Sequence, residues 1–307
     1  MGPFLPAQQT RFITTAVLYL IMRTMSRLFV KKLTVIDFSY LHRTRGLLGE
    51  SWLVDVELEG GLDSQGMVLD FADVKKTIKR LIDDDFDHKL IIPEQYHGSQ
   101  TRRQDDRLQN RFTTESGQHI EHTAPASAYC FLDSGDVTPD ALAEAIKQRL
   151  QPLLPENVQN IRLSLYPEAI DGPFYHYSHG LRQHAGNCQR IAHGHRSRIE
   201  IFTNGKRSPL LEQHWAGVWK DIYIGCRSDI SGRQTQNNEP YLHFSYSACQ
   251  GNFDLILPEK NCYLIDTDST VENLARHLLE ESARLQPGQS IRVQAYEGVD
   301  KGAIEVS

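Results

Sequence analysis

The sequence predicts an α+β protein built from two copies of one folding unit, and three observations support this prediction. Some segments alternate apolar and polar residues with the period of two that a β-strand requires, as in residues 52–60. Other segments place apolar residues three and four positions apart, as at Val74, Ile78 and Leu81, which indicates amphipathic helices. Finally, matching residues recur at near-constant offsets in the two halves of the chain.

The composition sets limits on the class of protein. The chain has 307 residues, is 40% hydrophobic and 23% charged, and carries a formal net charge of −6. This is typical of a soluble globular protein with one large domain or two of ordinary size. The mildly acidic balance argues against a nucleic-acid binder, which would show a basic face. Five cysteines without a Cys-x-x-Cys pair indicate a reduced, cytoplasmic protein.

The N-terminal residues are expected to lie outside the fold. The apolar run within residues 12–22 is too short to cross a membrane, and no small-residue cleavage site follows it. Met25 opens a segment that reads like a natural start, so residues 1–24 are interpreted as an upstream extension or a wrongly chosen start codon. The predicted division is an extension over residues 1–27, a first unit over 28–168 and a second unit over 169–307.

The elements of the first unit follow from local patterns. We expect strands over residues 28–39 and 52–60, a helix over 72–83, a hairpin around Gly117, a helix from Thr138 and a strand over 160–166. The second helix is predicted because Thr138 can cap it and Pro139 suits its first turn. Residues 100–110 are polar and charged, and we expect a mobile loop there.

The second half repeats this plan with one deletion. Gly49 corresponds to Gly194 at an offset of 145, whereas Thr138 corresponds to Thr270 at an offset of 132. The second half is therefore 13 residues shorter between its second strand and its late helix, and no helix is expected in that interval. Strands are expected instead at residues 221–224 and 241–246, followed by the late helix and by strands at 291–296 and 303–306.

The segment 188–195 carries the strongest functional signal. His193 and His195 are two positions apart, so on a strand their imidazoles point to the same side. A third histidine from a neighbouring strand would give three protein ligands and an open position, the pattern of a catalytic zinc site. Candidates for this third ligand just upstream are His176, His179 and His184. Ordinary strand histidines would give the same spacing.

These residues resemble the family of 6-pyruvoyl-tetrahydropterin and 6-carboxytetrahydropterin synthases. The matching motifs are Tyr175-x-x-x-His179, Cys188, His193-Gly-His195 and Glu297 in the second half, and Phe38-x-x-x-His42, Gly66–Phe71 and Asp87-His88 in the first. The resemblance covers nearly all of residues 28–307 as two copies. It implies two tandem tunnelling-fold (T-fold) units, each a four-stranded antiparallel sheet with helices on one face. It also implies assembly into a homo-oligomer.

Each half lacks motifs that the other keeps. The His-Gly-His motif is replaced by Leu48-Gly49-Glu50 in the first half, which is therefore expected to have lost its zinc. The Asp-His pair has no counterpart in the second half. Because sites in this family lie at subunit interfaces, we hypothesise one composite site. It would combine zinc and Cys188 from the second half with Asp87 and His88 from the first, within one chain or between neighbouring chains.

The resemblance also implies a reaction. The chain would be a zinc-dependent lyase that converts 7,8-dihydroneopterin triphosphate to a 6-substituted tetrahydropterin. A 6-carboxytetrahydropterin synthase is favoured over the pyruvoyl branch if the host makes queuosine. No nucleic-acid or membrane partner is expected.

The resemblance assigns a role to each site residue. Zn²⁺ would be held by His179, His193 and His195, with His176 or His184 as alternatives to His179. Cys188 would act as the base beside an Asp87-oriented His88, and Glu297 would bind the pterin ring.

Each assignment has a simpler alternative. Cys188 could be an inert buried thiol, Asp87-His88 could cap the preceding helix, and Glu297 could be a solvated residue at a strand end. At the level of the whole protein, the alternative is a non-catalytic or zinc-independent pterin-binding T-fold protein.

Overall fold

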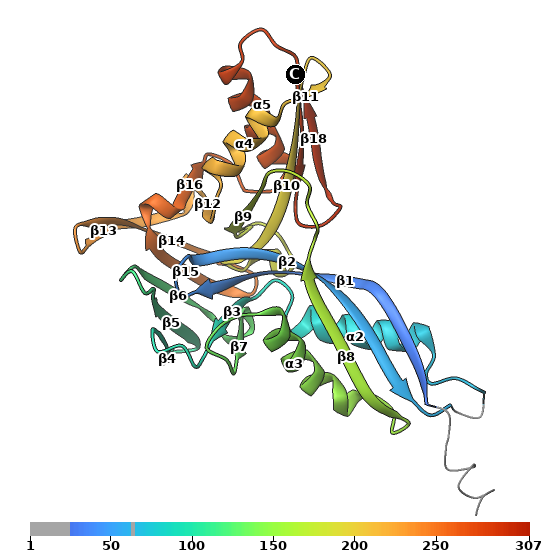
Figure 1. The fold of residues 1–307 in the computed structure, drawn as a ribbon. Helices are drawn as coiled ribbons and strands as arrows, with labels where there is room; N and C mark the ends of the chain where they lie inside the picture. The colour runs from blue at the N-terminus through green and yellow to red at the C-terminus, as the bar shows by residue number, and fades with distance from the viewer. Residues whose placement is uncertain (1–24, 63–64) are drawn as a thin grey trace, which may run out of the picture.

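The computed structural model describes residues 25–62 and 65–307 (Figure 1). It confirms the predicted α+β class, with two units that each combine a sheet and helices. The extension proposed for residues 1–24 lies outside the described residues. Ser26 and Arg27, which the prediction assigned to the extension, already belong to the first strand and pair with Gly60 and Glu59.

The sheet of the first unit has the strand order β7-β3-β1-β2-β8. Its elements are β1 (Ser26–His42), β2 (Gly46–Gly60), α2 (Phe71–Asp85), β3 (Leu90–Pro93), β7 (Tyr129–Leu132), α3 (Pro139–Leu150) and β8 (Val158–Pro167). Strands β1, β2 and β8 are antiparallel, whereas β3 and β7 add to the sheet in parallel, so the sheet exceeds the four strands expected. Helices α2 and α3 cover one face (Figure 1) and bury Val74, Ile78 and Leu142 against it.

The second unit repeats this arrangement with the order β16-β12-β9-β10-β17-β18. Its elements are β9 (Phe174–His179), β10 (His193–Thr203), β11 (Lys206–Arg207), α4 (Pro209–Val218), β12 (Ile222–Cys226), β16 (Cys262–Ile265), α5 (Val271–Leu285), β17 (Ile291–Tyr296) and β18 (Gly302–Val306). The Thr270 side chain caps α5 by accepting a hydrogen bond from the Asn273 backbone N–H.

Helix α4 corrects the prediction that the second half has no helix in this interval. Pro209 occupies the first turn, and Leu211 and Trp215 lie one turn apart on the buried side. Ser208-Pro209 is the same type of start signal as Thr138-Pro139. The helix is short, with ten residues, which is why its apolar stripe gives only a weak periodic pattern.

A third sheet joins the two units, and the sequence did not predict it. Its strands are β4 (Ser99–Gln104), β5 (Arg107–Thr113), β6 (His119–Pro125), β13 (Ile230–Gln236), β14 (Glu239–Ala248) and β15 (Gly251–Pro258). Residues 100–110, expected to form a mobile loop, instead form most of β4 and the start of β5. The two groups of strands meet where β6 of the first unit pairs with β15 of the second. The strands expected at residues 221–224 and 241–246 are present as β12 and β14.

The two units also meet where β1 and β2 pack against β9 and β10 (Figure 1). The Ser39 hydroxyl donates to Ser178 Oγ at 2.7 Å. A Cβ added to Gly194 would lie 2.5 Å from Gly49 Cα. Equivalent residues of the repeat therefore touch each other, which is the contact expected at a pseudo-twofold axis.

We expect Gly49→Ala to disrupt this contact between the units. A Cβ at Gly49 would lie 1.8 Å from the carbonyl oxygen of Tyr177 and 2.5 Å from the backbone nitrogen of His195. The backbones must separate, so the free energy of unfolding should fall by about 3 kcal/mol or more in chemical denaturation. Gly217→Ala is the control, because it meets no atom within 4 Å and should change stability by less than about 1 kcal/mol. An equally small effect at Gly49 would contradict this packing.

Candidate active site

Three histidines of the second unit converge on one point. His193 and His195 lie on one side of β10, and His179 of β9 pairs directly opposite His193. Each offers a ring nitrogen within 4.8 Å of those of the other two, and all three side chains are buried. The structure therefore brings together the three predicted metal ligands.

The hydrogen bonds of these rings suit a metal ion. His179 Nδ1 lies 3.0 Å from Ser269 Oγ, and His193 Nδ1 lies 3.2 Å from the Arg190 carbonyl oxygen. The Nε2 atoms of both rings are buried, and no described residue bonds to them. The pKa of His193 lies well below its usual value, mainly because the ring is buried and also because other imidazoles lie close to it. Burial likewise lowers the pKa of His179. Neutral imidazoles with a free Nε2 are the form that binds a divalent metal, so the residues fit such an ion.

The two alternative third ligands lie elsewhere. His176 points to the interface between the units, where its Nδ1 lies 2.8 Å from the Gly49 carbonyl oxygen. His184 is exposed, and its Nδ1 accepts a hydrogen bond from the Gly186 backbone N–H. Among the described histidines of this region, His179 is therefore the one placed to complete the cluster.

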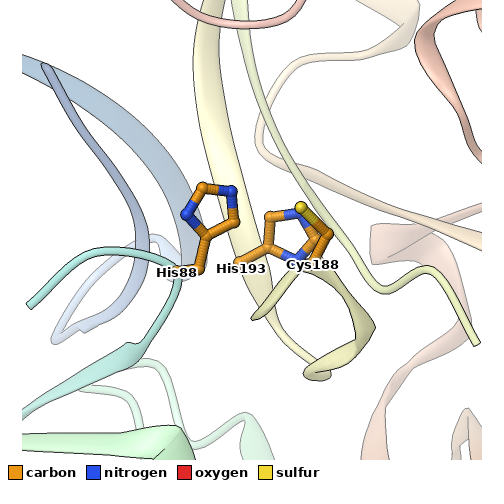
Figure 2. A group of neighbouring side chains, drawn as sticks. All are labelled: His88, Cys188 and His193. Carbon is orange, nitrogen blue, oxygen red and sulfur yellow. The ribbon is translucent and has the colours of Figure 1, made fainter. Parts of the chain in front are cut away.

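A second group of side chains joins the two units. Figure 2 shows His88 of the first unit beside Cys188 and His193 of the second. These three residues also offer possible ligand atoms within 4.8 Å of one another. Cys188 lies in a short 3-10 helix (Asn187–Gln189) ahead of β10 and is partly exposed, so it is not an isolated buried thiol.

Hydrogen bonds to strand β1 hold His88 in position. His88 follows α2 with a positive φ of 53°, and its N–H donates to the Asp37 carbonyl oxygen at 2.7 Å. The Asp37 N–H in turn donates to Asp87 Oδ1 at 2.8 Å. His88 Nδ1 lies 2.5 Å from Asp87 Oδ2. The Asp-His pair is thus anchored to the sheet, while the Asp87 backbone N–H also donates to the Ile82 carbonyl oxygen of α2 at 2.9 Å.

The electrostatics of His88 depend on its two neighbours. Burial by itself lowers its pKa, but hydrogen bonds to the Asp87 carboxylate and the Cys188 thiol raise the pKa to about 10. His88 is therefore cationic at neutral pH. A cation beside a thiol favours the thiolate, which is the nucleophilic and basic form of cysteine.

Glu297 lies at the end of β17, near the three histidines. Its Oε1 is 3.9 Å from His195 Nε2, and its backbone N–H donates to the Lys301 carbonyl oxygen. The side chain is 24% exposed, so it faces the site while remaining accessible to a ligand. Its predicted contact with a pterin ring stays a prediction.

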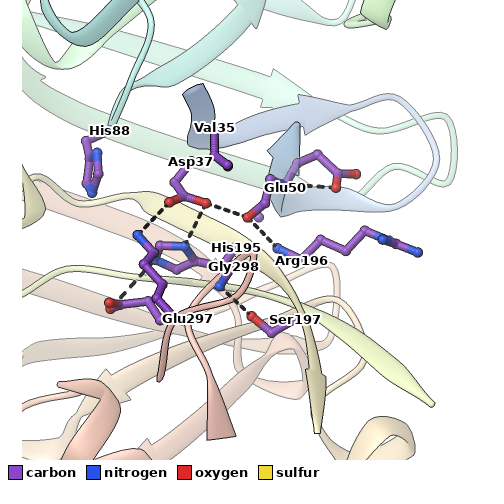
Figure 3. A network of polar contacts seen from close by, with 12 residues as sticks. Val35, Asp37, Glu50, His88, His195, Arg196, Ser197, Glu297 and Gly298 are labelled. Carbon is purple, nitrogen blue, oxygen red and sulfur yellow. Dashed lines mark hydrogen bonds and ion pairs between the residues drawn. The ribbon is translucent and has the colours of Figure 1, made fainter. Parts of the chain in front are cut away.

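The sequence interpretation missed Asp37, which Figure 3 shows in this network, and Lys301, which bonds to it. Asp37 Oδ1 lies 3.2 Å from His195 Nδ1, and Lys301 Nζ donates to Asp37 Oδ2 at 2.8 Å. Burial raises the pKa of Asp37, but His195 and Lys301 outweigh it and hold that pKa well below its usual value. Asp37 carries no motif signal, because its role depends on a residue in the other unit.

The first unit has a different set of residues at the equivalent point. Tyr40 pairs with Leu48 as His179 pairs with His193, so Tyr40 rather than His42 corresponds to His179. This shifts the predicted Phe38-x-x-x-His42 correspondence by two positions. The carboxylate of Glu50 stands in place of the His195 ring, and the loss of a metal site in this unit stays a prediction.

Asp221 occupies the position equivalent to His88. Both residues precede the strand that pairs in parallel with the first strand of their unit, and Asp221 has a φ of 56°. Its carboxylate accepts hydrogen bonds from the Arg45 guanidinium. An ion pair between the units therefore takes the place of the His88–Cys188 contact.

We expect Glu50→Gln to change the pH dependence of stability. Burial raises the pKa of Glu50 to about 7, from its usual value of 4.5. A raised pKa means that Glu50 supports the fold below pH 4.5 and loses that contribution as pH rises through 7. At pH 8 the variant should therefore be more stable than the parent by about 1–3 kcal/mol, with little difference at acidic pH.

Denaturation of the metal-free proteins at several pH values measures this difference. Exposed Glu115→Gln is the control and should show no such trend. A Glu50 variant that is less stable than the parent at pH 8 would show that the ionised carboxylate supports the interface instead.

Comparison with known proteins connects this geometry to a family. Residues 33–171 match the family model described as 6-pyruvoyl tetrahydropterin synthase. The matched range covers most of the first unit, whereas the three histidines lie beyond it.

Two proteins from Pyrococcus species and one solved structure are also similar to parts of this chain. The chain is 28% identical over 137 residues to a Pyrococcus abyssi protein named "Putative 6-carboxy-5,6,7,8-tetrahydropterin synthase", covering 43% of this chain and 76% of the relative. A protein of the same name from Pyrococcus horikoshii is 23% identical over 133 residues, with the same coverage. The solved 6-pyruvoyl tetrahydropterin synthase of Plasmodium vivax is 18% identical, covers 46% of this chain and 91% of that structure, and gives a TM-score of 0.38.

Proposed function

Since residues 33–171 form a domain of the 6-pyruvoyl tetrahydropterin synthase family, we propose that this chain is a zinc-dependent lyase acting on 7,8-dihydroneopterin triphosphate. The product would be a 6-substituted tetrahydropterin. The observation that carries the proposal is the convergence of the three histidines with Cys188 and His88 at the contact between the units. One composite site would then form within a single chain.

The three histidines would hold the metal through their Nε2 atoms. Bound Zn²⁺ would act there as a Lewis acid that makes the C–H next to a coordinated side-chain oxygen more acidic. The choice of zinc is supported by the donor set, since three neutral imidazoles with an open position are typical of catalytic zinc.

The chain's own groups would perform the proton transfer. The Cys188 thiolate would take the proton from the substrate side chain, and the His88 imidazole beside it would pair with the charge of the thiolate. Asp87 orients the His88 ring through Nδ1. The Glu297 carboxylate would accept hydrogen bonds from the amino and ring N–H groups of the pterin, a planar bidentate contact.

The carboxy branch is favoured over the pyruvoyl branch. Its support comes from the names of the two archaeal relatives, both 6-carboxy-5,6,7,8-tetrahydropterin synthases by that name. The spacing of four residues between Cys188 and His193 does not separate the branches.

The test is to incubate protein of known zinc content with 7,8-dihydroneopterin triphosphate and to identify the products by mass spectrometry. A 6-carboxy or a 6-pyruvoyl product would establish the lyase and identify its branch. Intact substrate beside a full zinc complement would refute the lyase and leave a pterin-binding protein as the alternative.

We further expect the chain to associate with copies of itself. Strand β18 lies at the end of its sheet, and its residues Ile304 and Val306 are exposed. An edge strand with exposed apolar side chains is a template for pairing with another chain. Light scattering during size-exclusion chromatography would measure the mass. Within the described residues, no helix is long and apolar enough to span a membrane.

A further inference from the structure

A buried carboxylate of the first unit faces a predicted metal ligand of the second. Asp37 on β1 is only 3% exposed, and its Oδ1 lies 3.2 Å from Nδ1 of His195 on β10 (Figure 3). The two residues are 158 positions apart in sequence and meet only because the units pack against each other.

The other contacts of Asp37 all come from donors. The Ser51 hydroxyl donates to Oδ1, and Lys301 Nζ donates to Oδ2 at 2.8 Å. An ionised carboxylate can only accept hydrogen bonds. Nδ1 of His195 lies 3.2 Å from Oδ1 without hydrogen-bond geometry and has no other partner among the described residues. A hydrogen on Nδ1 would face an acceptor here, whereas a bare Nδ1 would face a carboxylate that it cannot bond. This leaves Nε2 of His195 as the nitrogen available to a metal.

We propose that Asp37 is a positioning residue that fixes the ring and tautomer of His195 for metal binding. This inference rests on the proposed function, because it assumes that the three histidines hold a metal. The Nδ1 atoms of His179 and His193 face oxygens of Ser269 and Arg190, which belong to the second unit. His195 Nδ1 instead faces Asp37 of the first unit, which is the unit without a His-Gly-His motif. A hydrogen-bonded carboxylate behind a metal-binding histidine typically contributes tenfold to hundredfold to metal affinity.

The pseudo-twofold axis provides a matched control. In the repeat, His176 is equivalent to Asp37, and Glu50 is equivalent to His195. His176 Nδ1 lies 3.7 Å from Glu50 Oε2. Both pairs join the units through one acid and one imidazole, and both acids come from the first unit. Only the Asp37 pair includes a residue of the histidine cluster.

The test compares Asp37→Asn with Glu50→Gln in the full-length protein. Zinc affinity is measured by competition with a chromogenic chelator, and the ligand field is monitored by the visible spectrum of bound Co²⁺. We expect Asp37→Asn to weaken zinc binding by about 10–100-fold and to alter the Co²⁺ spectrum. Glu50→Gln should change neither. Equal zinc affinity and an unchanged spectrum in Asp37→Asn would overturn the inference.

A rescue variant separates positioning from general damage. The asparagine at position 37 has an NH₂ group in place of one carboxylate oxygen. This group must face either Lys301 Nζ or the donors on the other side, and two donors that face each other repel. Adding Lys301→Gln supplies an acceptor for that NH₂ group and should restore zinc affinity to within a few-fold of the parent. Failure of this rescue, with both variants folded by circular dichroism, would mean that the charge rather than the hydrogen bond matters, and would overturn the positioning role.

A measurement on the unmodified protein covers the case in which the variants do not fold. In the zinc-loaded parent, ¹⁵N-histidine NMR should show the hydrogen of His195 on Nδ1, and a hydrogen on Nε2 would overturn the inference. Failure of the proposed function is distinguishable from these results. If the parent binds zinc but forms no product, only the lyase proposal is refuted. If the parent binds no zinc, the lyase proposal and the role of Asp37 are both refuted.

Discussion

Replacing His88 with glutamine is expected to lower turnover by roughly 10²–10⁴-fold while zinc content stays unchanged. His88 belongs to the first unit and lies beside Cys188 of the second. Its pKa is raised to about 10, so the imidazole is cationic at neutral pH. Glutamine keeps a polar side chain but cannot carry the positive charge. The variant would therefore lack the cation that pairs with a cysteine thiolate, which is the basic form of that side chain.

The measurement is steady-state turnover together with zinc analysis of the same samples. His97→Gln is the control, since this exposed histidine belongs to the same unit and contacts Tyr96 rather than the site. Unchanged turnover in the His88 variant would refute the composite site. Loss of zinc would instead assign His88 to the metal, a role that its distance from Cys188 and His193 also permits.

Replacing His193 with alanine is expected to remove both the bound zinc and the turnover. His193 is fully buried, and its Nε2 faces the other two histidines without a partner among the described residues. Bound metal stabilises a protein by about 2.7 kcal/mol at a free concentration one hundred times its dissociation constant. Zinc should therefore raise the melting temperature of the parent protein and leave that of the variant unchanged.

His184→Ala provides the comparison for this experiment. His184 was an alternative third ligand, but it is exposed and lies outside the cluster. Its variant should bind zinc as the parent does. A His193 variant that still melts at a higher temperature with zinc would place the metal elsewhere.

Much of the architecture was accessible from sequence because the signals are local. The alternation of apolar residues in strands and their periodicity in helices show which face of each element is buried. The constant offset between matching residues, such as Gly49 and Gly194, revealed the repeat. The spacing of His193 and His195 was enough to place both on one side of a strand. The third sheet escaped prediction because residues 100–104 are polar and mostly exposed, and because β6 finds its partner β15 more than a hundred residues away.

The sequence by itself determined the class of the fold, its duplication and the residues with the chemistry of a metal site. Each of these follows from patterns within a few neighbouring positions. Only the tertiary structure decided that His88, held by Asp87, meets Cys188 within one chain. It also decided that Asp37 and Lys301 join the site. Those contacts depend on two glycine-containing strands approaching across the pseudo-twofold axis, where the missing Cβ atoms let the backbones touch. No local pattern encodes such a contact, because its energy arises only when both units are folded.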